Sequence, residues 1–389
     1  MPDKSRIVET KRDQPNYPRL SDMAAYLNKI APLAAAESWD NVGLIAAPRG
    51  NPTIKRVLIA LDLTRDVLDE CRRQKIDMLI CYHPPIFKPL AKLIPAGDTP
   101  ESLALELFRM GVAIYSPHTA LDVADGGTND ALAAALQIRV VGSLTDVPAA
   151  ERQFKLVTFV PEDAVETMAA AIFATGAGCI GKNSRYTCCS FHTPGHGTFR
   201  GDETTHPAVG EKGRLEVVPE IRWETVVHQT VLSQAIAALR GAHPYEEPAF
   251  DVIPMANPST HPGMGRIGTL PELTTLSELA RIAKKRLRLP LVQITGSASA
   301  QVRTCAIVAG SGGKLALEAR RKVPFDVLIT GELKHHDLLA YRAAGIHVLL
   351  LGHGESETPV LHSLSDSLRQ LFPGLEIAVI QPGGMISIT

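Results

Sequence analysis

The sequence lacks the features that mark membrane and secreted proteins. It contains no run of about 18 apolar residues, the length that a membrane-spanning helix requires. The first twenty residues are polar and charged, without the apolar centre of a signal peptide. We therefore expect a cytoplasmic protein that does not bind a membrane.

An excess of charge of one sign is also absent, and cysteine is scarce. The formal net charge is −1, from 40 Lys and Arg against 41 Asp and Glu. A protein with so small a net charge has no overall electrostatic field that would indicate a nucleic-acid partner. The cysteines contain no Cys-x-x-Cys pair, so reduced and mostly buried thiols are expected in place of disulfides. They number six: Cys71, Cys81, Cys179, Cys188, Cys189 and Cys305.

The two flanks of the chain alternate short apolar strands with helices. This pattern runs from about residue 20 to 150 and returns after about residue 275, and it predicts largely parallel sheet covered on both faces. The flanks are either halves of one α/β/α domain or two similar lobes. Among the predicted elements are a helix Met23–Ile30 capped by Ser21, strands Arg56–Leu63, Asp77–Cys81, Val112–Tyr115 and His347–Leu351, and a helix Thr358–Leu371.

The middle of the chain has a different order of elements. Its apolar patterns predict β-α-β-β-α-β, which is the split ferredoxin-like arrangement. Glycine and proline cluster on both sides, at 142–148 and 254–268. We therefore predict an inserted α+β domain at residues 151–264, which interrupts an α/β domain made of residues 20–150 and 265–389.

Histidines follow three of the predicted strands. His83 comes after the first of them, His118 with Asp122 after the second, and His353 with Glu357 after the third. The carboxyl ends of parallel strands share one edge of a sheet, so these side chains can converge. A lone histidine beside proline is more often a packed residue, but three such clusters predict a site for Zn, Mn or Fe.

A fourth polar segment, TGELKHHD (330–337), also follows a predicted strand. Its Glu332, His335 and His336 could bind metal, orient the metal ligands or transfer protons. The alternative is an ordinary helix start, with Thr330 or Gly331 near the cap and Glu332 in the first turn.

Two familiar catalytic motifs are incomplete or missing. The segment 308–315 resembles a phosphate-binding loop, but Val308 replaces its first glycine and Leu315 replaces Ser or Thr. It is better interpreted as a glycine-rich turn between a strand and a helix. No Gly-x-Ser-x-Gly element of a serine hydrolase is present.

Five segments together resemble the NIF-three-like dinuclear metal-centre family, whose members are also labelled GTP cyclohydrolase I type 2 homologues. They are WDNVGL (39–44), YHPPIFKP (82–89), IYSPHTALDVADGGTND (114–130), TGELKHHD (330–337) and GHGESE (352–357). The predicted insert resembles the CutA/PII-like domain of longer bacterial members in GAGCIGKNSRYTCCSF (176–191), GTFRGDE (197–203) and AHPYEEPAFDVIP (242–254).

The resemblance implies a ring-shaped homohexamer with divalent metals in each subunit. Carried over by position, the metal ligands are His83, Asp122, His353 and Glu357. Tyr82 stands where the family usually has the first His of a His-His-Pro motif. The loss of that imidazole should weaken one of the two metal positions, so we expect one to two ions of Zn, Fe or Mn per chain.

The resemblance favours a metal-dependent hydrolase that acts on a nucleotide or purine-like small molecule. In this interpretation Glu332, His335 or His336 transfers protons. One alternative is a non-catalytic regulatory or chaperone-like hexamer that senses a small ligand through its inserted domain. Another alternative is a phosphoester hydrolase.

Overall fold

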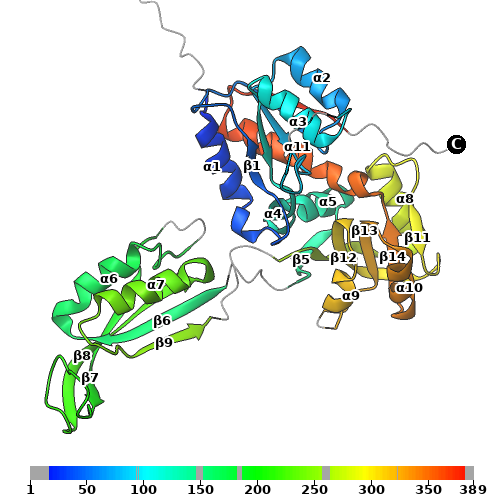
Figure 1. Cartoon of the computed structure of the whole chain (residues 1–389). Helices are drawn as coiled ribbons and strands as arrows, with labels where there is room; N and C mark the ends of the chain where they lie inside the picture. Colours follow the sequence, from blue (N-terminus) through cyan, green and yellow to red (C-terminus); the bar gives the residue numbers. More distant parts are fainter. Residues whose placement is uncertain are drawn as a thin grey trace, which may run out of the picture. The chain divides into compact units, whose positions relative to one another are not determined.

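A computed structural model describes residues 17–92, 94, 96–145, 152–181, 186–255, 263–321 and 323–381. The chain divides into two compact units (Figure 1). The first consists of Met1–Leu144 with Gly265–Thr389, and the second is Thr145–Met264. The first domain border predicted above, at residues 150 and 151, lies outside the described residues. None of the helices in the described part of the chain has the length and apolar character that crossing a bilayer requires.

The first lobe of the first unit is built on a five-stranded sheet. Its order is β1 (Gly43–Ala46), β4 (Ala113–Ser116), β3 (Met78–Cys81), β2 (Arg56–Ala60) and β15 (Glu376–Val379). Only β1 is antiparallel to its neighbour in this sheet. Successive side chains of a strand point to opposite faces, so Val57 and Ile59 pack with α1 (Leu20–Ile30), while Leu58 packs with α2 (Arg65–Gln74) and α3 (Pro100–Arg109).

The second lobe has a six-stranded sheet. Its order is β11 (Gln293–Thr295), β14 (His347–Leu350), β13 (Val327–Glu332), β12 (Gln301–Ser311), β10 (Arg266–Thr275) and β5 (Arg139–Ser143). The three strands β12, β13 and β14 are parallel, and the outer strands are antiparallel. Helix α8 (Leu276–Arg286) packs into one core cluster of this sheet, and α9 (Leu315–Ala319) and α10 (His335–Ala343) into the other. The predicted α/β class is therefore confirmed, in the form of two lobes.

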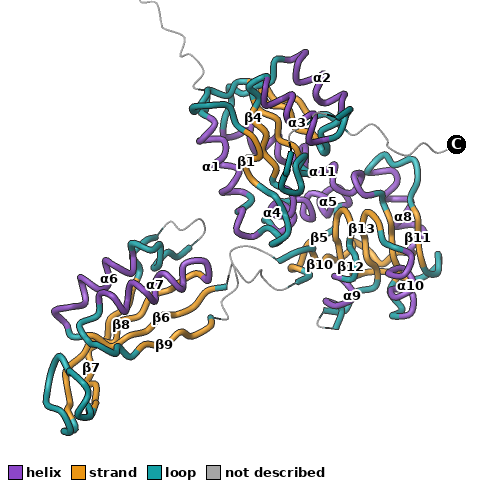
Figure 2. The backbone as a smooth tube through the Cα atoms, viewed as in Figure 1, coloured by secondary structure: helices purple, strands orange, loops and turns teal. Residues whose placement is uncertain are grey.

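Helices α5 (Thr128–Leu136) and α11 (His353–Leu371) connect the two lobes (Figure 2). Ala131 of α5 packs in the first core, whereas Leu132 packs in the second. Helix α11 begins directly after β14 of the second sheet, yet it buries Leu361 and Leu364 in the first core. A polar side chain at the start of α11 therefore lies at the junction of the lobes.

Two predicted helix starts are wrong. Helix α1 begins at Leu20 after Arg19, because the Asp22 carboxylate accepts a hydrogen bond from the Arg19 N–H and closes the first turn. Ser21 lies inside the helix and does not cap it. Helix α11 begins at His353 and contains Pro359, which the prediction had placed near the helix start. Because the helix starts earlier than predicted, His353 and Glu357 lie on one helical turn.

The second unit has a four-stranded antiparallel sheet. Its elements are β6 (Gln153–Val160), α6 (Val165–Phe173), β7 (Ser190–Phe199), β8 (Glu216–His228), α7 (Gln229–Ala242) and β9 (Phe250–Pro254), in the sheet order β7-β8-β6-β9. Both helices pack against the sheet around the buried Trp223 (Figure 1). The predicted β-α-β-β-α-β order is confirmed. None of the six cysteines forms a disulfide.

The buried Arg266 ties the end of α4 (His118–Val123) and the start of α5 to the second lobe. Arg266 is 2% exposed and donates to both carboxylate oxygens of Asp130, at 2.8 and 2.9 Å. The same guanidinium donates to the carbonyl oxygens of Val123 and Ala124, at 3.2 and 2.8 Å. The segment that carries His118 and Asp122 is thereby held against β10.

Replacing Arg266 with methionine is expected to lower the free energy of unfolding by about 1.5–3 kcal/mol, because the Asp130 carboxylate and two backbone carbonyl oxygens lose a charged hydrogen-bond donor. Urea denaturation followed by circular dichroism measures this loss. The control is Arg281→Met, which removes an exposed pair with Glu278 and should cost less than about 1 kcal/mol. An equal, small effect of both substitutions would show that the Arg266 pair does not stabilise the fold.

Candidate metal centre

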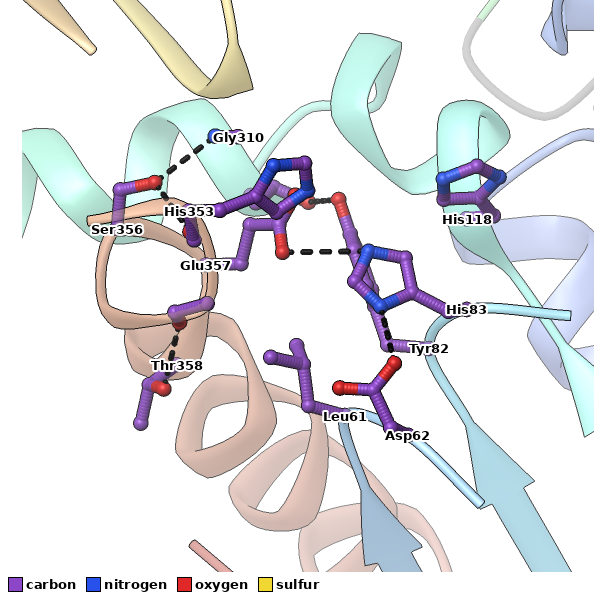
Figure 3. Close-up of polar contacts among 12 residues, drawn as sticks. Leu61, Asp62, Tyr82, His83, His118, Gly310, His353, Ser356, Glu357 and Thr358 are labelled. Atoms are coloured by element: carbon purple, nitrogen blue, oxygen red, sulfur yellow. Dashed lines mark hydrogen bonds and ion pairs between the residues drawn. The ribbon is translucent and has the colours of Figure 1, made fainter. Parts of the chain in front are cut away.

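The packing of the two lobes brings two histidines and a glutamate together. His83 lies two residues beyond β3, and its backbone N–H continues the strand pairing by donating to the Leu61 carbonyl at 2.9 Å. His353 and Glu357 lie four residues apart in the first turns of α11, so their side chains share a helix face. Figure 3 shows the imidazoles of His83 and His353 both next to the Glu357 carboxylate.

These three side chains form a compact group of potential metal ligands. One ligand atom from each of His83, His353 and Glu357 lies within 4.8 Å of the others. Nε2 of His83 is 3.3 Å from Oε2 of Glu357, and Nε2 of His353 is 3.3 Å from Oε1. The ligand-bearing edges of both imidazoles therefore face one carboxylate.

A second carboxylate lies behind each imidazole. Nδ1 of His83 is 2.8 Å from Asp62 Oδ1, and Nδ1 of His353 is 3.1 Å from Glu332 Oε1. Such contacts fix the orientation and tautomer of an imidazole that binds metal. Asp62 was not among the predicted site residues, although it follows the buried strand β2 in the same way as His83 follows β3.

The charges of the group are strongly coupled. Burial opposes a charge on His83, but its hydrogen bond to the Asp62 carboxylate and the nearby Glu357 carboxylate outweigh burial and raise the pKa of His83 to about 10. Glu357 raises the pKa of His353 to about 9, with Glu332 adding to the effect. Burial disfavours the Glu357 anion, yet the two imidazoles hold the pKa of Glu357 below its usual value. A divalent cation would replace the imidazole protons as the counter-charge.

The Glu357 carboxylate has an unused acceptor that fits a cation. Glu357 is 4% exposed, and its Oε2 accepts no hydrogen bond from the described residues, although His83 Nε2 lies 3.3 Å away. A buried acceptor without a hydrogen-bond donor lowers the stability of the folded protein by about 1–3 kcal/mol. Two imidazoles and one carboxylate are donors that suit Zn, Mn or Fe(II). The group is therefore a possible metal site.

The glycine-rich turn after β12 forms one wall of this group. Gly310 has φ +67°, and a Cβ at this position would lie 2.3 Å from Glu357 Oε1 and 3.4 Å from His353 Nε2. The Gly310 N–H donates to Ser356 Oγ at 2.8 Å, which ties the turn to α11. The segment that resembles an incomplete phosphate loop thus lies against the group of potential metal ligands, a placement that its sequence did not predict.

Asp122 lies beside the group but not within it. Its carboxylate accepts a short hydrogen bond from the hydroxyl of Tyr82, which itself accepts one from Thr128 at 3.3 Å. Removal from water raises the pKa of Asp122 to about 6; the Tyr82 hydrogen bond opposes this shift and the charge of Glu357 adds to it. Tyr82 therefore engages the carboxylate that was predicted to bind metal. The assignment of Asp122 as a ligand stays a prediction.

His118 is directed to a different partner. It has φ +25°, and its Nδ1 lies 2.8 Å from Oδ1 of the buried Asp40, whose Oδ2 accepts from the Thr119 N–H at 3.1 Å. The imidazole of His118 still lies near the group, with its ring centroid 5.3 Å from that of His83. Although one helical turn separates His118 from Asp122, the two side chains bind different residues.

The fourth predicted segment contributes one residue to the surroundings of the group. Glu332 ends β13 and contacts His353, while 60% of its side chain is exposed. Helix α10 begins at His335 with Lys334 at its cap, so the alternative that placed Glu332 in a first helical turn is wrong. His335 and His336 are exposed and lie outside the group. Their part in proton transfer stays a prediction.

Comparison with known families identifies the chain. A family model described as Duf34/NIF3 (NGG1p interacting factor 3) matches residues 18–382. The chain belongs to the Duf34/NIF3 family. The resemblance inferred from the five sequence segments is thereby confirmed.

Relatives in the Duf34/NIF3 family align along most of their length. A protein of Bacillus subtilis named GTP cyclohydrolase 1 type 2 homolog is 37% identical over 329 residues, which cover 84% of this chain and 85% of the relative. A protein of the same name from Halalkalibacterium halodurans is 36% identical and covers 83% of this chain and 85% of its own length.

Solved structures of the family agree with the fold. The Bacillus cereus protein related to NIF3 superposes with a TM-score of 0.69 at 30% identity, covering 96% of this chain and 99% of its own. A Staphylococcus aureus protein superposes with a TM-score of 0.74 at 25% identity, covering 96% of this chain and 99% of its own. The likeness therefore extends over both units of the chain.

Proposed function

We propose that this protein is a metal-dependent hydrolase that acts on a nucleotide or purine-like small molecule. The observation that carries the proposal is the His83–His353–Glu357 group, in which a further carboxylate orients each imidazole. The relatives' name, GTP cyclohydrolase 1 type 2 homolog, supports a guanine nucleotide as the first substrate to test. The group would hold Zn, Fe or Mn, with one to two ions per chain.

In this proposal the side chains around the group have different roles in the reaction. A divalent metal held there would supply Lewis-acid activation of water and stabilise negative charge on the substrate. Glu332 reaches solvent while it contacts His353, so its carboxylate can accept a proton from water and return it to a leaving group. Tyr82 draws the Asp122 carboxylate to itself, which favours one tightly held ion and a second, weaker one.

The test is turnover of a nucleotide panel by the full chain after reconstitution with Zn, Mn or Fe(II). GTP, GDP, GMP and guanosine are incubated with the protein, and products are separated by liquid chromatography. We expect Glu332→Gln to lower kcat about 10²–10⁴-fold, the usual share of a general acid or base, at metal concentrations that saturate the site of the variant. Glu318→Gln, which changes a glutamate of α9 outside the group, is the control.

Two results would argue against this function. A fully metal-loaded protein that turns over no member of the panel would exclude these nucleotides as substrates. If GTP then raised the melting temperature without being consumed, a regulatory assembly that binds a ligand would be the better interpretation.

A further inference from the structure

Two segments of the second unit that carry its resemblance to the CutA/PII-like domain meet at one cavity. Neither segment belongs to the metal centre. GTFRGDE (197–203) begins at the end of β7, and AHPYEEPAFDVIP (242–254) connects α7 to β9. Figure 1 shows β7 and β8 extending past the ends of α6 and α7. Residues of both segments line a cavity of about 420 Å³. Pockets for small molecules in proteins usually measure about 300–1,000 Å³.

Hydrogen bonds hold the walls of this cavity in place. The buried His243 donates from Nε2 to the Phe159 carbonyl at 3.1 Å and accepts at Nδ1 from the Tyr245 N–H, also at 3.1 Å. Both nitrogens of this neutral imidazole are therefore used in positioning Tyr245. Glu246 accepts from the His206 N–H at 2.8 Å, which links the second segment to the loop after β7. The cavity therefore has a framework that does not depend on a ligand.

A buried hydroxyl without a partner lies in the wall of the cavity. Oη of Tyr245 is shielded from solvent and forms no hydrogen bond with the described residues. Burial raises the pKa of Tyr245, and the neighbouring Glu220 carboxylate adds to this effect. Buried polar groups in proteins are almost always hydrogen-bonded. The hydroxyl and the neighbouring Glu220 carboxylate therefore form the polar part of this wall of the cavity.

The charge of the cavity is predominantly negative. Its lining includes Glu220, Glu246 and Glu247 but only one guanidinium, from Arg200. An adjoining cavity of about 720 Å³ shares Glu220 and Tyr245 and adds two more carboxylates, those of Glu162 and Asp163. A ligand with a positive charge fits this lining better than an anion.

The spacing of the carboxylates and the apolar walls distinguish an organic cation from a metal ion. In the described part of the chain, the His83–His353–Glu357 group is the one set of three potential ligands close enough to hold a metal. The carboxylates of the cavity are more widely spaced, and Phe159, Phe199 and Val209 lie among them. Such a combination fits a cation that carries an apolar body.

We propose that this cavity binds a small organic cation, a primary ammonium group joined to an apolar or aromatic body. The ammonium group faces Glu220 and the hydroxyl of Tyr245. Gly197 leaves room for this carboxylate, because a Cβ there would lie 2.0 Å from Glu220 Oε2. Every residue that lines the cavity lies within the second unit, so the proposal does not depend on the hydrolase function of the metal centre.

The test is calorimetric titration of the full chain with two probes of similar shape and opposite charge. We expect 2-phenylethylammonium to bind saturably and 3-phenylpropanoate not to bind at the same concentrations. Glu220→Gln, which keeps the shape and removes the charge, should weaken binding of the ammonium at least tenfold. Glu166→Gln removes an exposed charge on α6 outside both cavities and should leave binding unchanged.

Two further variants make the result specific to this cavity. Tyr245→Phe keeps the ring and removes the hydroxyl, so it should weaken binding even if Glu220→Gln does not fold. His353→Ala changes only the metal centre and should bind the ammonium as the unmodified chain does. The proposal is wrong if the ammonium does not bind, if the carboxylate probe binds equally well, or if binding survives in the folded cavity variants. Loss of binding in His353→Ala would also overturn it, because the cation would then occupy the metal centre.

Discussion

Replacing His353 with alanine is expected to remove nearly all bound metal, lowering it from one to two ions per chain to less than about a tenth of that level. The imidazole Nε2 of this residue is one of the three potential ligand atoms that lie within 4.8 Å of one another. Loss of a residue that only orients a ligand already weakens metal binding about 10–100-fold, and loss of a ligand should exceed this effect. Elemental analysis after dialysis against a fixed free Zn or Mn concentration measures the change.

The matched control for this experiment is His362→Ala. His362 lies on the same helix and is exposed, but it is outside the metal-binding group. It should retain the full metal content. A His353→Ala protein with the metal content of the unmodified chain would remove His353 from the site and leave His83 and Glu357 without a third ligand.

Replacing Gly310 with alanine is expected to weaken metal binding at least about 100-fold, although alanine adds only one methyl group. Its Cβ would lie 2.3 Å from Glu357 Oε1, so either the turn or the carboxylate must move. Glu357 is enclosed in the first turns of α11 and has little room to move. Since two ligands from α11 face this turn, the displacement should disturb both of them. Titration calorimetry with Zn or Mn measures the loss.

The matched control is Gly313→Ala in the same turn. Gly313 also has a positive φ, +48°, but a Cβ there would meet no atom within 4 Å. It should therefore show only the backbone cost of a left-handed alanine, about 1–2 kcal/mol of stability, with metal affinity retained. If both variants lost metal to the same extent, backbone strain and not contact with Glu357 would explain the effect.

Local patterns in the sequence were sufficient to predict the class of fold and most of the candidate ligands. Apolar strands alternating with helices indicate parallel sheet because such strands are buried on both faces. The β-α-β-β-α-β order of the second unit follows from the same local signals. His353 and Glu357 were grouped because they stand in one short segment directly after a predicted strand. These features depend on neighbours in the chain, so the sequence determined them by itself.

The tertiary structure decided how these pieces meet. The histidines were expected along the edge of one sheet, but His83 follows a strand of the first sheet and His353 follows one of the second. Helix α11 starts at the second sheet and is buried in the first core, and this packing brings the two histidines together. No local pattern encodes that convergence, because it depends on contacts between residues that are far apart in the sequence.

The difference between local patterns and long-range contacts also explains which features of the site the sequence alone determined and which it did not. The identities of His83, His353 and Glu357 as potential ligands are visible in short segments of sequence. The carboxylate of Asp62 behind His83, the hydrogen bond between Tyr82 and Asp122, and the approach of Gly310 to Glu357 are not. Each of these contacts joins residues at least 20 positions apart, so only the tertiary packing of the chain creates them. The sequence therefore determined which side chains are candidate metal ligands, and the tertiary structure determined what surrounds them.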